Sequence, residues 1–477
     1  MPINSFLYPG AKVTTGYDVD NSLRFNRASS DNLSATLATD NGDVHKWTYS
    51  FWFKRSTLGS DQQITSAHYS GSYAGGIVFR STDQFEIFDY RNNSFSLQKK
   101  TNRLFRDVSA WYHIVISNDN SVSSPDLKIY VNGVEETSFA TDNEYSQNED
   151  NSFNNSAYTN RIGAGGVNND YIGGYLSEFC FIDGTALDAT SFGEFDEDSG
   201  IWKPIAVSGL TFGTNGFYLD FENSGSLGAD VSGNGNNFTV NNLTAIDQST
   251  DTCTNNFATW NSLDNFYQSN TYSEGNLQVQ TQNTSFTYNF ATIGVSTGKW
   301  YWEVEYDAKS GGTDQPFVGI TSTQPTSNDH ELGNFPNDFA WYTDNGTGYL
   351  SNNNTYSNVG FNAYTVGDVI SVALDLDNNK LYFAKNGTWE KSGNPESGST
   401  GTGAISITAT ASTPLGAYFP SVADGTTSYN ATFKANFGNP IVTISSGNSD
   451  GNGYGNFEYA VPSGYYSLNS KNLAEYG

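Results

Sequence analysis

Apolar and polar residues alternate in short runs along nearly the whole chain. Residues 47–53 (WTYSFWF) and residues 299–306 (KWYWEVEY) are the clearest examples. A period of two residues is typical of β-strands, because successive side chains point to opposite faces of a sheet. Clusters of Gly, Pro and Asn interrupt every longer run, and the one helical candidate, residues 188–195, is long enough for only a turn or so. The pattern predicts an all-β fold.

Two of the predicted strands end in the dipeptide Asn-Gly, within residues 127–133 (LKIYVNG) and residues 381–387 (LYFAKNG). Asn-Gly supplies the positive φ angles of a type I′ hairpin turn. Each hairpin has its own upstream aromatic strand, so we predict two antiparallel jelly-roll-type β-sandwiches joined by a Gly/Asn-rich bridge. The expected parts are an N-terminal docking segment 1–16, a first sandwich 17–195, a bridge 196–254 that completes or caps it, a second sandwich 255–440, and a C-terminal packing segment 441–477.

The charge balance narrows the range of partners. Asp and Glu number 50 against 22 Lys and Arg, which gives a net charge of −28. Such a surface repels phosphates, so we expect no nucleic-acid partner. We also expect no membrane insertion, because no run approaches the roughly 18 apolar residues of a membrane span. The first twenty residues lack the basic start and apolar run of a classical secretion signal. A surface of uncharged polar residues suits an extracellular or particle-bound protein.

The sequence contains too few cysteines for a fold stabilised by several disulfides. Cys180 and Cys253 are the only two cysteines, and they lie in segments assigned to different parts. A disulfide framework is therefore excluded. A single bridge between them stays open, but two distant cysteines are more often small buried apolar residues.

The first sandwich carries a series of strand motifs: the strand at residues 47–54, the segment 111–116 (WYHIVI), the hairpin 127–133 and the Gly-rich strand 172–179. In this order they resemble a laminin G domain, a member of the concanavalin A-like lectin and glucanase group, whose closing strand the Gly-rich strand fits. The resemblance covers about residues 17–195. It implies a β-sandwich but marks no site residue.

The second sandwich opens with a Gly turn and an aromatic strand, residues 297–304 (TGKWYWEV). This segment resembles the opening of a SPRY domain. Later signposts follow in the family's order: residues 318–320 (VGI), 367–370 (GDVI), 382–387, 418–420 (YFP) and 435–438 (ANFG). This resemblance covers roughly residues 255–440 and implies a second sandwich whose loops commonly carry ligand sites.

The layout as a whole resembles a class of marine bacteriophage virion proteins. That resemblance implies a virion surface location, as a tail fibre, appendage or capsid decoration, with other virion proteins, host cell-surface glycans and copies of itself as partners. In this interpretation residues 1–16 dock on a scaffold or on a neighbouring subunit.

The sequence contains few residue combinations that could support catalysis. A glycosidase needs paired carboxylates about 5–10 Å apart. Glu303, Glu305 and Asp307 alternate on one strand face, but Glu303 is part of the SPRY strand signature. The histidines are dispersed, without a neighbouring Cys or second His at metal-ligand spacing, and no serine nucleophile motif accompanies them; they are His45, His68, His113 and His330. We predict that the protein is not an enzyme.

Two segments are candidate binding sites. Residues 341–349 (WYTDNGTGY) combine aromatic rings with amide and carboxylate groups, which is how proteins hold sugar rings and hydroxyls. The candidate ligand residues are Trp341, Tyr342, Asp344, Asn345 and Tyr349; the alternative is sandwich packing for Trp341 and a turn for residues 344–348. Oxygen-bearing side chains alternate at Asp230, Ser232, Asn234 and Asn236 as a weak Ca²⁺ candidate, and the alternative there is a series of tight turns. We expect no other cofactor.

The leading hypothesis is a virion protein that attaches to host glycans through several weak sites. The alternative is a purely structural virion decoration or scaffold, and a polysaccharide depolymerase is the least favoured.

Overall fold

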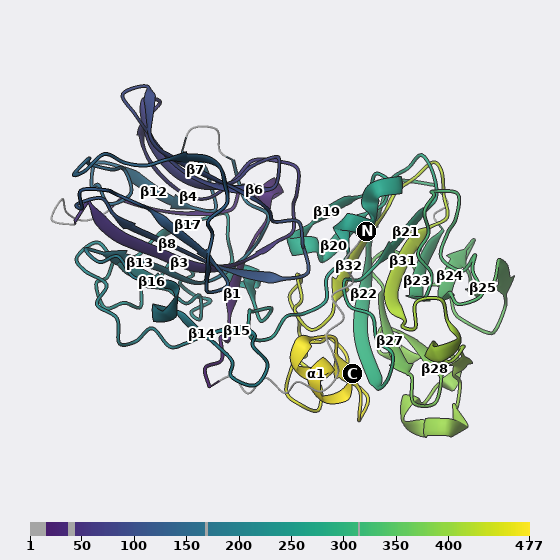
Figure 1. Ribbon diagram of the computed structural model, residues 1–477. Helices are drawn as coiled ribbons and strands as arrows, with labels where there is room; N and C mark the ends of the chain where they lie inside the picture. Colours follow the sequence, from purple (N-terminus) through teal and green to yellow (C-terminus); the bar gives the residue numbers. More distant parts are fainter. Residues whose placement is uncertain (1–15, 37–42, 167–169, 313–314) are drawn as a thin grey trace. The chain divides into compact units, whose positions relative to one another are not determined.

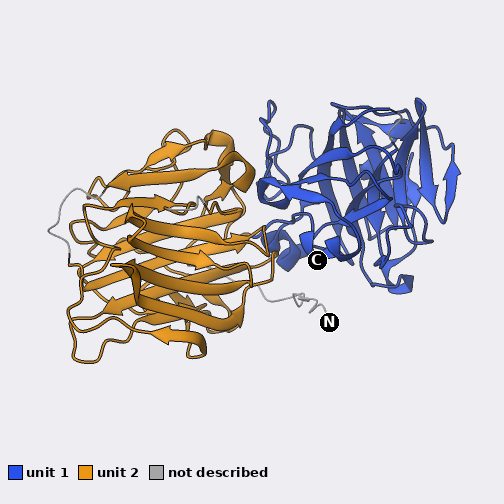
Figure 2. Cartoon of the chain, turned by 90° about the horizontal axis from the view of Figure 1, so that it is seen from above, with its two compact units in different colours: residues 1–12, 256–477 blue, residues 13–255 orange. Residues whose placement is uncertain are grey.

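The computed structural model describes residues 16–36, 43–166, 170–312 and 315–477. The predicted docking segment 1–16, apart from its last residue, lies outside these ranges. The described residues form two compact units, residues 16–255 and residues 256–477, coloured orange and blue in Figure 2 and called here the N-terminal unit and the C-terminal unit. Both are built of antiparallel sheets, which confirms the prediction of an all-β fold.

The N-terminal unit has two main sheets, and several of their strands are labelled in Figure 1. The β3–β13 sheet runs, in spatial order, β10 (Val134–Glu135), β9 (Lys128–Val131), β8 (Trp111–Asp119), β3 (Lys46–Arg55), β13 (Gly174–Asp183), β1 (Ser22–Phe25) and β18 (Gln248–Ser249), with β16 (Phe217–Leu219) paired to β13. The β5–β6 sheet runs β11 (Phe139–Asn143), β7 (Ser94–Leu104), β6 (Gln84–Arg91), β5 (Tyr73–Phe79), β4 (Gln62–Ser70), β12 (Thr159–Ile162), β2 (Asn32–Thr36) and β17 (Thr239–Asn241). A small ribbon joins β14 (Gly193–Phe195) to β15 (Trp202–Pro204).

The C-terminal unit also has two sheets. The β22–β27 sheet runs β19 (Thr271–Ser273), β20 (Gln278–Gln280), β32 (Ala431–Asn436), β22 (Lys299–Lys309), β27 (Val369–Asp375), β28 (Lys380–Lys385) and β29 (Thr388–Trp389), with β30 (Ile405–Ser406) on β28 and β33 (Tyr466–Ser467) in a short parallel pair with β22. The β23–β24 sheet runs β21 (Thr287–Phe290), β31 (Phe419–Asp424), β23 (Pro316–Thr321), β24 (Phe339–Asp344), β25 (Thr347–Asn352) and β26 (Thr355–Ser357).

The central strand of the N-terminal unit is buried on both of its faces. Phe51 and Phe53 of β3 point into the core and pack with residues of the facing sheet, such as Phe79. Trp52 points the other way and is covered by residues that come after β13, among them Trp202. This covering explains why the run at residues 47–53 carries aromatic side chains at successive positions rather than only at alternate ones.

The central strand of the C-terminal unit is covered in the same manner. Trp300 and Trp302 of β22 lie in the core between the two sheets. Tyr301 points outward and packs against Phe457 and Tyr465. Residues 441–477 therefore belong to the C-terminal unit as the layer over the outer face of β22.

Both Asn-Gly turns form as the sequence predicts. Asn132 and Asn386 have a φ of 48°, and the glycine after each has a φ of 78°. The turns close the β9–β10 and β28–β29 hairpins. The positive φ angles match the type I′ turn whose twist suits the flanking strands.

The predicted bridge is part of the N-terminal unit. Its strands β16, β17 and β18 pair with β13, β2 and β1, so they extend both sheets of that unit. The assignment of the two cysteines to different parts is wrong, because Cys253 packs against the same cluster that buries Cys180. Both thiols are free.

Helices are short in the described part of the chain. The segment at residues 188–195 holds a 3-10 turn, Ala189–Ser191, whose Thr190 N–H is accepted by the side chain of Asp188. One α-helix is present among the described residues, α1 (Ser470–Tyr476), and the sequence pattern did not predict it. Within those residues, neither it nor any other helix has the length and apolar character needed to cross a bilayer.

Candidate functional site

The predicted ligand segment, residues 341–349, is a β-hairpin rather than a loop. It comprises the end of β24 and the start of β25, joined by a turn in which Asn345 has a φ of 48° and Gly346 a φ of 76°. Asp344 and Asn345 lie at this turn, where the Asn345 amide donates to Asp344 Oδ1 over 3.0 Å. The hairpin fixes which side chains share a face, because neighbours along a strand point in opposite directions.

Trp341 faces the core, so its prediction as a sugar-contacting ring is wrong. Its exposed fraction is 0%. The indole packs against Phe361 and Tyr364, and its Nε1 donates to the Asn362 carbonyl over 3.0 Å. Trp341 is thus a structural residue of the sandwich, as the packing alternative had it.

Tyr342 points to the opposite, outer face of the β23–β24 sheet. Its ring stacks on Phe317 with a centroid separation of 4.4 Å and an interplanar angle of 16°. Tyr349 and Tyr356 pack against the same ring, at centroid distances of 5.9 Å and 4.8 Å. Only 4% of Tyr342 is exposed, so it supports the two outer rings rather than meeting a ligand itself.

Tyr356 and Glu331 complete this surface, and the sequence analysis missed both. Tyr356 lies on the edge strand β26 and is 46% exposed. Its hydroxyl donates to Glu331 Oε1. We call the group of Glu331, Asp344, Asn345, Tyr349 and Tyr356 the tyrosine surface. The sequence did contain a signal for Tyr356. Residues 355–357 (TYS) form a short polar run with one aromatic residue, which is typical of an edge strand that exposes a ring.

Glu331 is the electrostatically unusual member of the tyrosine surface. Burial, with a smaller contribution from the negative charge of Asp424, raises the pKa of its carboxyl to about 7. A methyl group added at Gly425 would come within 2.4 Å of Glu331 Oε2, so the carboxyl lies directly against the backbone of that glycine. Near neutral pH the group exists partly as an acid, which lets it donate as well as accept hydrogen bonds.

The arrangement of the tyrosine surface suits the recognition of hydroxyl-rich ligands. Partly exposed tyrosine rings offer apolar faces, and carboxyl and amide groups beside them offer hydrogen-bond donors and acceptors. No group of three or more His, Cys, Asp and Glu side chains placed to hold a metal ion occurs among the residues that the structure describes.

The four Ca²⁺ candidates instead organise a set of turns. Asp230 accepts from the backbone N–H groups of Tyr218, Ser232 and Asn236. The Asn234 and Asn236 amides both donate to the carbonyl of Gly216, over 2.8 and 2.9 Å. Ser232 Oγ accepts from the Asn234 N–H over 3.3 Å. All four side chains thus have hydrogen-bond partners within the turns, and we propose no metal site there.

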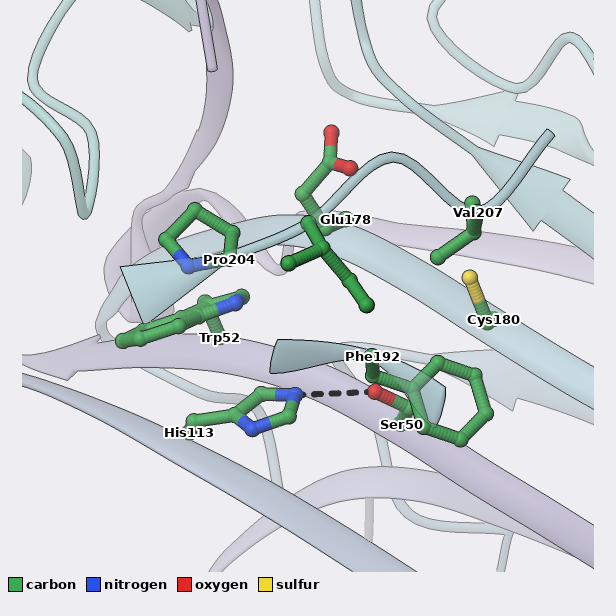
Figure 3. A pocket seen from close by; sticks show the side chains of 9 residues that line it. Ser50, Trp52, His113, Glu178, Cys180, Phe192, Pro204 and Val207 are labelled. Atoms are coloured by element: carbon green, nitrogen blue, oxygen red, sulfur yellow. Dashed lines mark hydrogen bonds between the residues drawn. The ribbon is translucent and has the colours of Figure 1, made fainter. Parts of the chain in front are cut away.

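A small cavity in the N-terminal unit brings Ser50 next to His113 (Figure 3). Ser50 Oγ lies 2.9 Å from His113 Nε2, and Trp202 Nε1 donates to His113 Nδ1 over 3.0 Å. Burial lowers the pKa of His113 to about 3, so the imidazole is neutral. An indole N–H can only donate, so Nδ1 is the acceptor and the ring proton resides on Nε2. His113 therefore donates to Ser50, which is the reverse of what a serine nucleophile needs.

Glu178 lines the same cavity, and its side chain points away from the Ser50–His113 pair in Figure 3. Its Oε2 accepts from the hydroxyls of Tyr17 and Tyr218, over 3.0 and 2.7 Å. Its backbone φ is 52°, at the irregularity where the pairing of β13 with β3 shifts. Burial raises the pKa of the carboxyl to about 7. The cavity has a volume of about 10 Å³, which is room for about one water molecule and not for a substrate.

Glu303 is buried, and its carboxylate is hydrogen-bonded to the C-terminal segment and to Tyr301. Its exposed fraction is 2%. Its carboxylate accepts from the backbone N–H groups of Glu458 and Tyr459, over 3.0 and 2.8 Å, and from the Tyr301 hydroxyl over 2.9 Å. These contacts give Glu303 a structural role, because they hold the layer formed by residues 441–477 against β22.

Comparisons with known proteins identify a domain in each unit. Residues 27–190 match the concanavalin A-like lectin/glucanases superfamily, in its laminin G-type model, and residues 299–440 match the SPRY domain. No curated protein matches the chain.

Solved structures give similar partial matches. The chain is similar to the SPRY domain of human HERC1, with 18% identity over 33% of this chain and 86% of that chain and a TM-score of 0.26. It is similar to a heptameric SAP-like pentraxin from Limulus polyphemus, with 16% identity over 36% and 79% and a TM-score of 0.27. It is also similar to domain 4 of the extracellular arabinanase AbnA from Geobacillus stearothermophilus, in complex with arabinotriose, with 16% identity over 30% and 63% and a TM-score of 0.24.

The predicted order of the two domains is confirmed: the chain carries a laminin G-like domain of the concanavalin A-like superfamily in its N-terminal unit and a SPRY domain in its C-terminal unit.

Proposed function

We propose that the protein is a non-enzymatic adhesion protein that binds glycans on a host cell surface through the tyrosine surface of its SPRY domain. The observation that carries the proposal is the placement of two partly exposed tyrosine rings, Tyr349 and Tyr356, beside the Asp344–Asn345 turn. The buried Glu331 carboxyl holds the Tyr356 hydroxyl in place. A sugar ring packs its apolar face on an aromatic ring while its hydroxyls meet carboxyl and amide groups. The match of the other domain to the concanavalin A-like lectin/glucanases superfamily agrees with an interaction with carbohydrate.

We further propose that the protein works on the surface of a bacteriophage particle, as an oligomer. The order of its two domains, which resembles that of bacteriophage virion proteins, supports this setting. Its net charge of −28 limits how it can meet a host. A strongly acidic protein is not drawn to an anionic bacterial surface by charge, so contact depends on specific short-range recognition. Repeated weak sites on one particle bind tightly together, because the second binding event is intramolecular.

The expected result on an array of bacterial surface polysaccharides is binding of the assembled wild-type protein and loss of most of that binding in Tyr356→Ala. The apparent affinity for one soluble oligosaccharide should fall about fivefold, since the loss of an aromatic contact costs on the order of 1 kcal/mol and 1.4 kcal/mol is tenfold. Phe266→Ala is the matched control, because Phe266 is 68% exposed in the same unit and lies outside the tyrosine surface. Absence of wild-type binding to every polysaccharide, or equal loss in both variants, contradicts the proposal.

The proposed location on a bacteriophage particle is tested by a separate measurement. Antibody labelling of purified particles, viewed by electron microscopy, should place the protein on the outside with residues of the tyrosine surface accessible. A tyrosine surface buried against other virion proteins would instead identify a structural decoration or scaffold.

A further inference from the structure

The C-terminal unit has a second candidate site in an open groove of about 360 Å³. That volume lies within the range of about 300–1,000 Å³ typical of small-ligand pockets. The groove is formed where β22 begins, where the turn between β27 and β28 passes, and where the C-terminal segment packs. Its lining includes Gly298, Lys299, Asp377, Gly464, Tyr466 and Tyr476.

One wall of the groove is a stacked pair of tyrosines. The rings of Tyr466 and Tyr476 are nearly parallel, with centroids 3.7 Å apart and an interplanar angle of 8°. Both rings are partly exposed. Tyr466 is held by the pairing of β33 with β22, and the Tyr476 hydroxyl donates to Asn452 Oδ1 over 3.3 Å. The pair is thus a fixed aromatic wall rather than two mobile side chains.

The other wall of the groove is polar. Asp377 Oδ1 accepts from the Gly298 N–H over 3.1 Å, which holds the carboxylate in place. Lys299 Nζ lies 3.3 Å from the buried Asp375 carboxylate and 5.7 Å from the centroid of the Tyr465 ring. With two carboxylates for one ammonium group, this wall favours a neutral or amino-bearing ligand over an acidic one.

Glycine keeps the groove open at Gly464. Its φ is +78°, and a methyl group added there would meet no atom within 4 Å. A side chain at this position therefore extends into free space instead of colliding with the fold. Asn is the replacement of choice, because it tolerates a positive φ better than other residues with a side chain.

We propose that this groove binds one pyranose unit of a neutral or amino sugar, with the tyrosine pair against the ring and Asp377 and Lys299 at its hydroxyls. The inference rests on the proposed glycan binding and adds a second contact site to each chain. Gly464, Tyr466 and Tyr476 all lie beyond residue 440, where the SPRY match ends. The site is therefore formed jointly by the start of β22, the β27–β28 turn and the C-terminal segment, and it shares no residue with the tyrosine surface.

The test is ligand-observed saturation-transfer NMR on the full chain, with the methyl glycosides of glucose, galactose, mannose and N-acetylglucosamine as probes. At least one probe should receive saturation from the wild-type protein. In Gly464→Asn its dissociation constant should rise about tenfold or more, which corresponds to about 1.4 kcal/mol. Gly416→Asn is the matched control, because Gly416 also has a positive φ of +67° and open space around it, yet lies outside the groove.

The variants separate this inference from the proposed function. A signal that is lost in Gly464→Asn but kept in Gly416→Asn and in Tyr356→Ala supports the groove. A signal that survives Gly464→Asn and disappears in Tyr356→Ala overturns the groove and leaves the tyrosine surface in place. No signal from any of the four probes with the wild-type protein also overturns the groove, whereas binding of polysaccharides on the array would still support the tyrosine surface.

Discussion

Asp251→Asn should lower the free energy of unfolding of the N-terminal unit by about 3–5 kcal/mol, the usual cost of leaving one charge of a buried pair without its partner. Asp251 Oδ2 lies 2.8 Å from Lys54 Nζ, and the two side chains are 0% and 1% exposed. Trp111 Nε1 donates to the other carboxylate oxygen over 3.1 Å. Asn preserves an acceptor for this indole, but it removes the charge and replaces the oxygen that accepts from Lys54 with an amide NH2 group. Hydrogen exchange of peptides from β3 and β13, followed by mass spectrometry on the full chain, measures the change.

Glu135→Gln is the control for this prediction. Glu135 pairs with Lys128 over 3.0 Å, and both side chains are about 40% exposed. An exposed pair contributes only about 0–1 kcal/mol, so this variant should stay close to the wild type. The double variant Lys54→Met/Asp251→Leu should regain most of the lost stability, because it removes both buried charges. Equal effects of Asp251→Asn and Glu135→Gln would show that the buried pair is not the anchor that its geometry indicates.

Much of the fold follows from local patterns in the sequence. The alternating runs define strands, and the Asn-Gly dipeptides at residues 132–133 and 386–387 define turns whose φ angles the structure reproduces. Both signals depend only on neighbouring residues, so they can be recognised without tertiary contacts.

The candidate site was only partly predictable from the sequence. Which face of a strand turns toward the core depends on contacts with residues far away in the sequence. Trp341 and Tyr342 are neighbours with the same aromatic character, and only packing against the other sheet decides which of them turns inward. Tyr356 and Glu331 are 25 residues apart, and they meet because β24, β25 and β26 pair in succession next to the segment that carries Glu331. No local pattern in the sequence connects them.

The α-helix escaped prediction for a related reason. Helix α1 has seven residues, too few to show a 3.6-residue period. Its start is fixed by Asn469, whose side chain accepts from the Asn472 N–H over 2.9 Å. Its apolar residues Leu473 and Tyr476 pack on the core of the C-terminal unit. Tertiary packing and one cap therefore stabilise it, and neither is visible as periodicity.

Glu178 should make the N-terminal unit less stable as the pH rises from about 4.5 to above 7. The folded state raises the pKa of this carboxyl from its ordinary value of 4.5 to about 7, chiefly through burial. Below pH 4.5 the group is protonated in both states, and its favourable contribution is complete. Between these values the unfolded chain releases the proton that the folded chain keeps. Above the folded pKa the loss is complete, at about 3 kcal/mol, because one pKa unit corresponds to about 1.4 kcal/mol.

Glu178→Gln isolates this contribution, because Gln cannot ionise yet still accepts from the hydroxyls of Tyr17 and Tyr218. The variant should gain about 3 kcal/mol relative to the wild type between pH 5 and pH 8, in hydrogen exchange of β13 peptides corrected for the pH dependence of intrinsic exchange. Peptides around Glu331 in the C-terminal unit serve as the internal control, because its pKa is also raised to about 7 and should keep its effect in both proteins. Parallel pH profiles of β13 in the two proteins would mean that Glu178 ionises as readily in the folded chain as in the unfolded one.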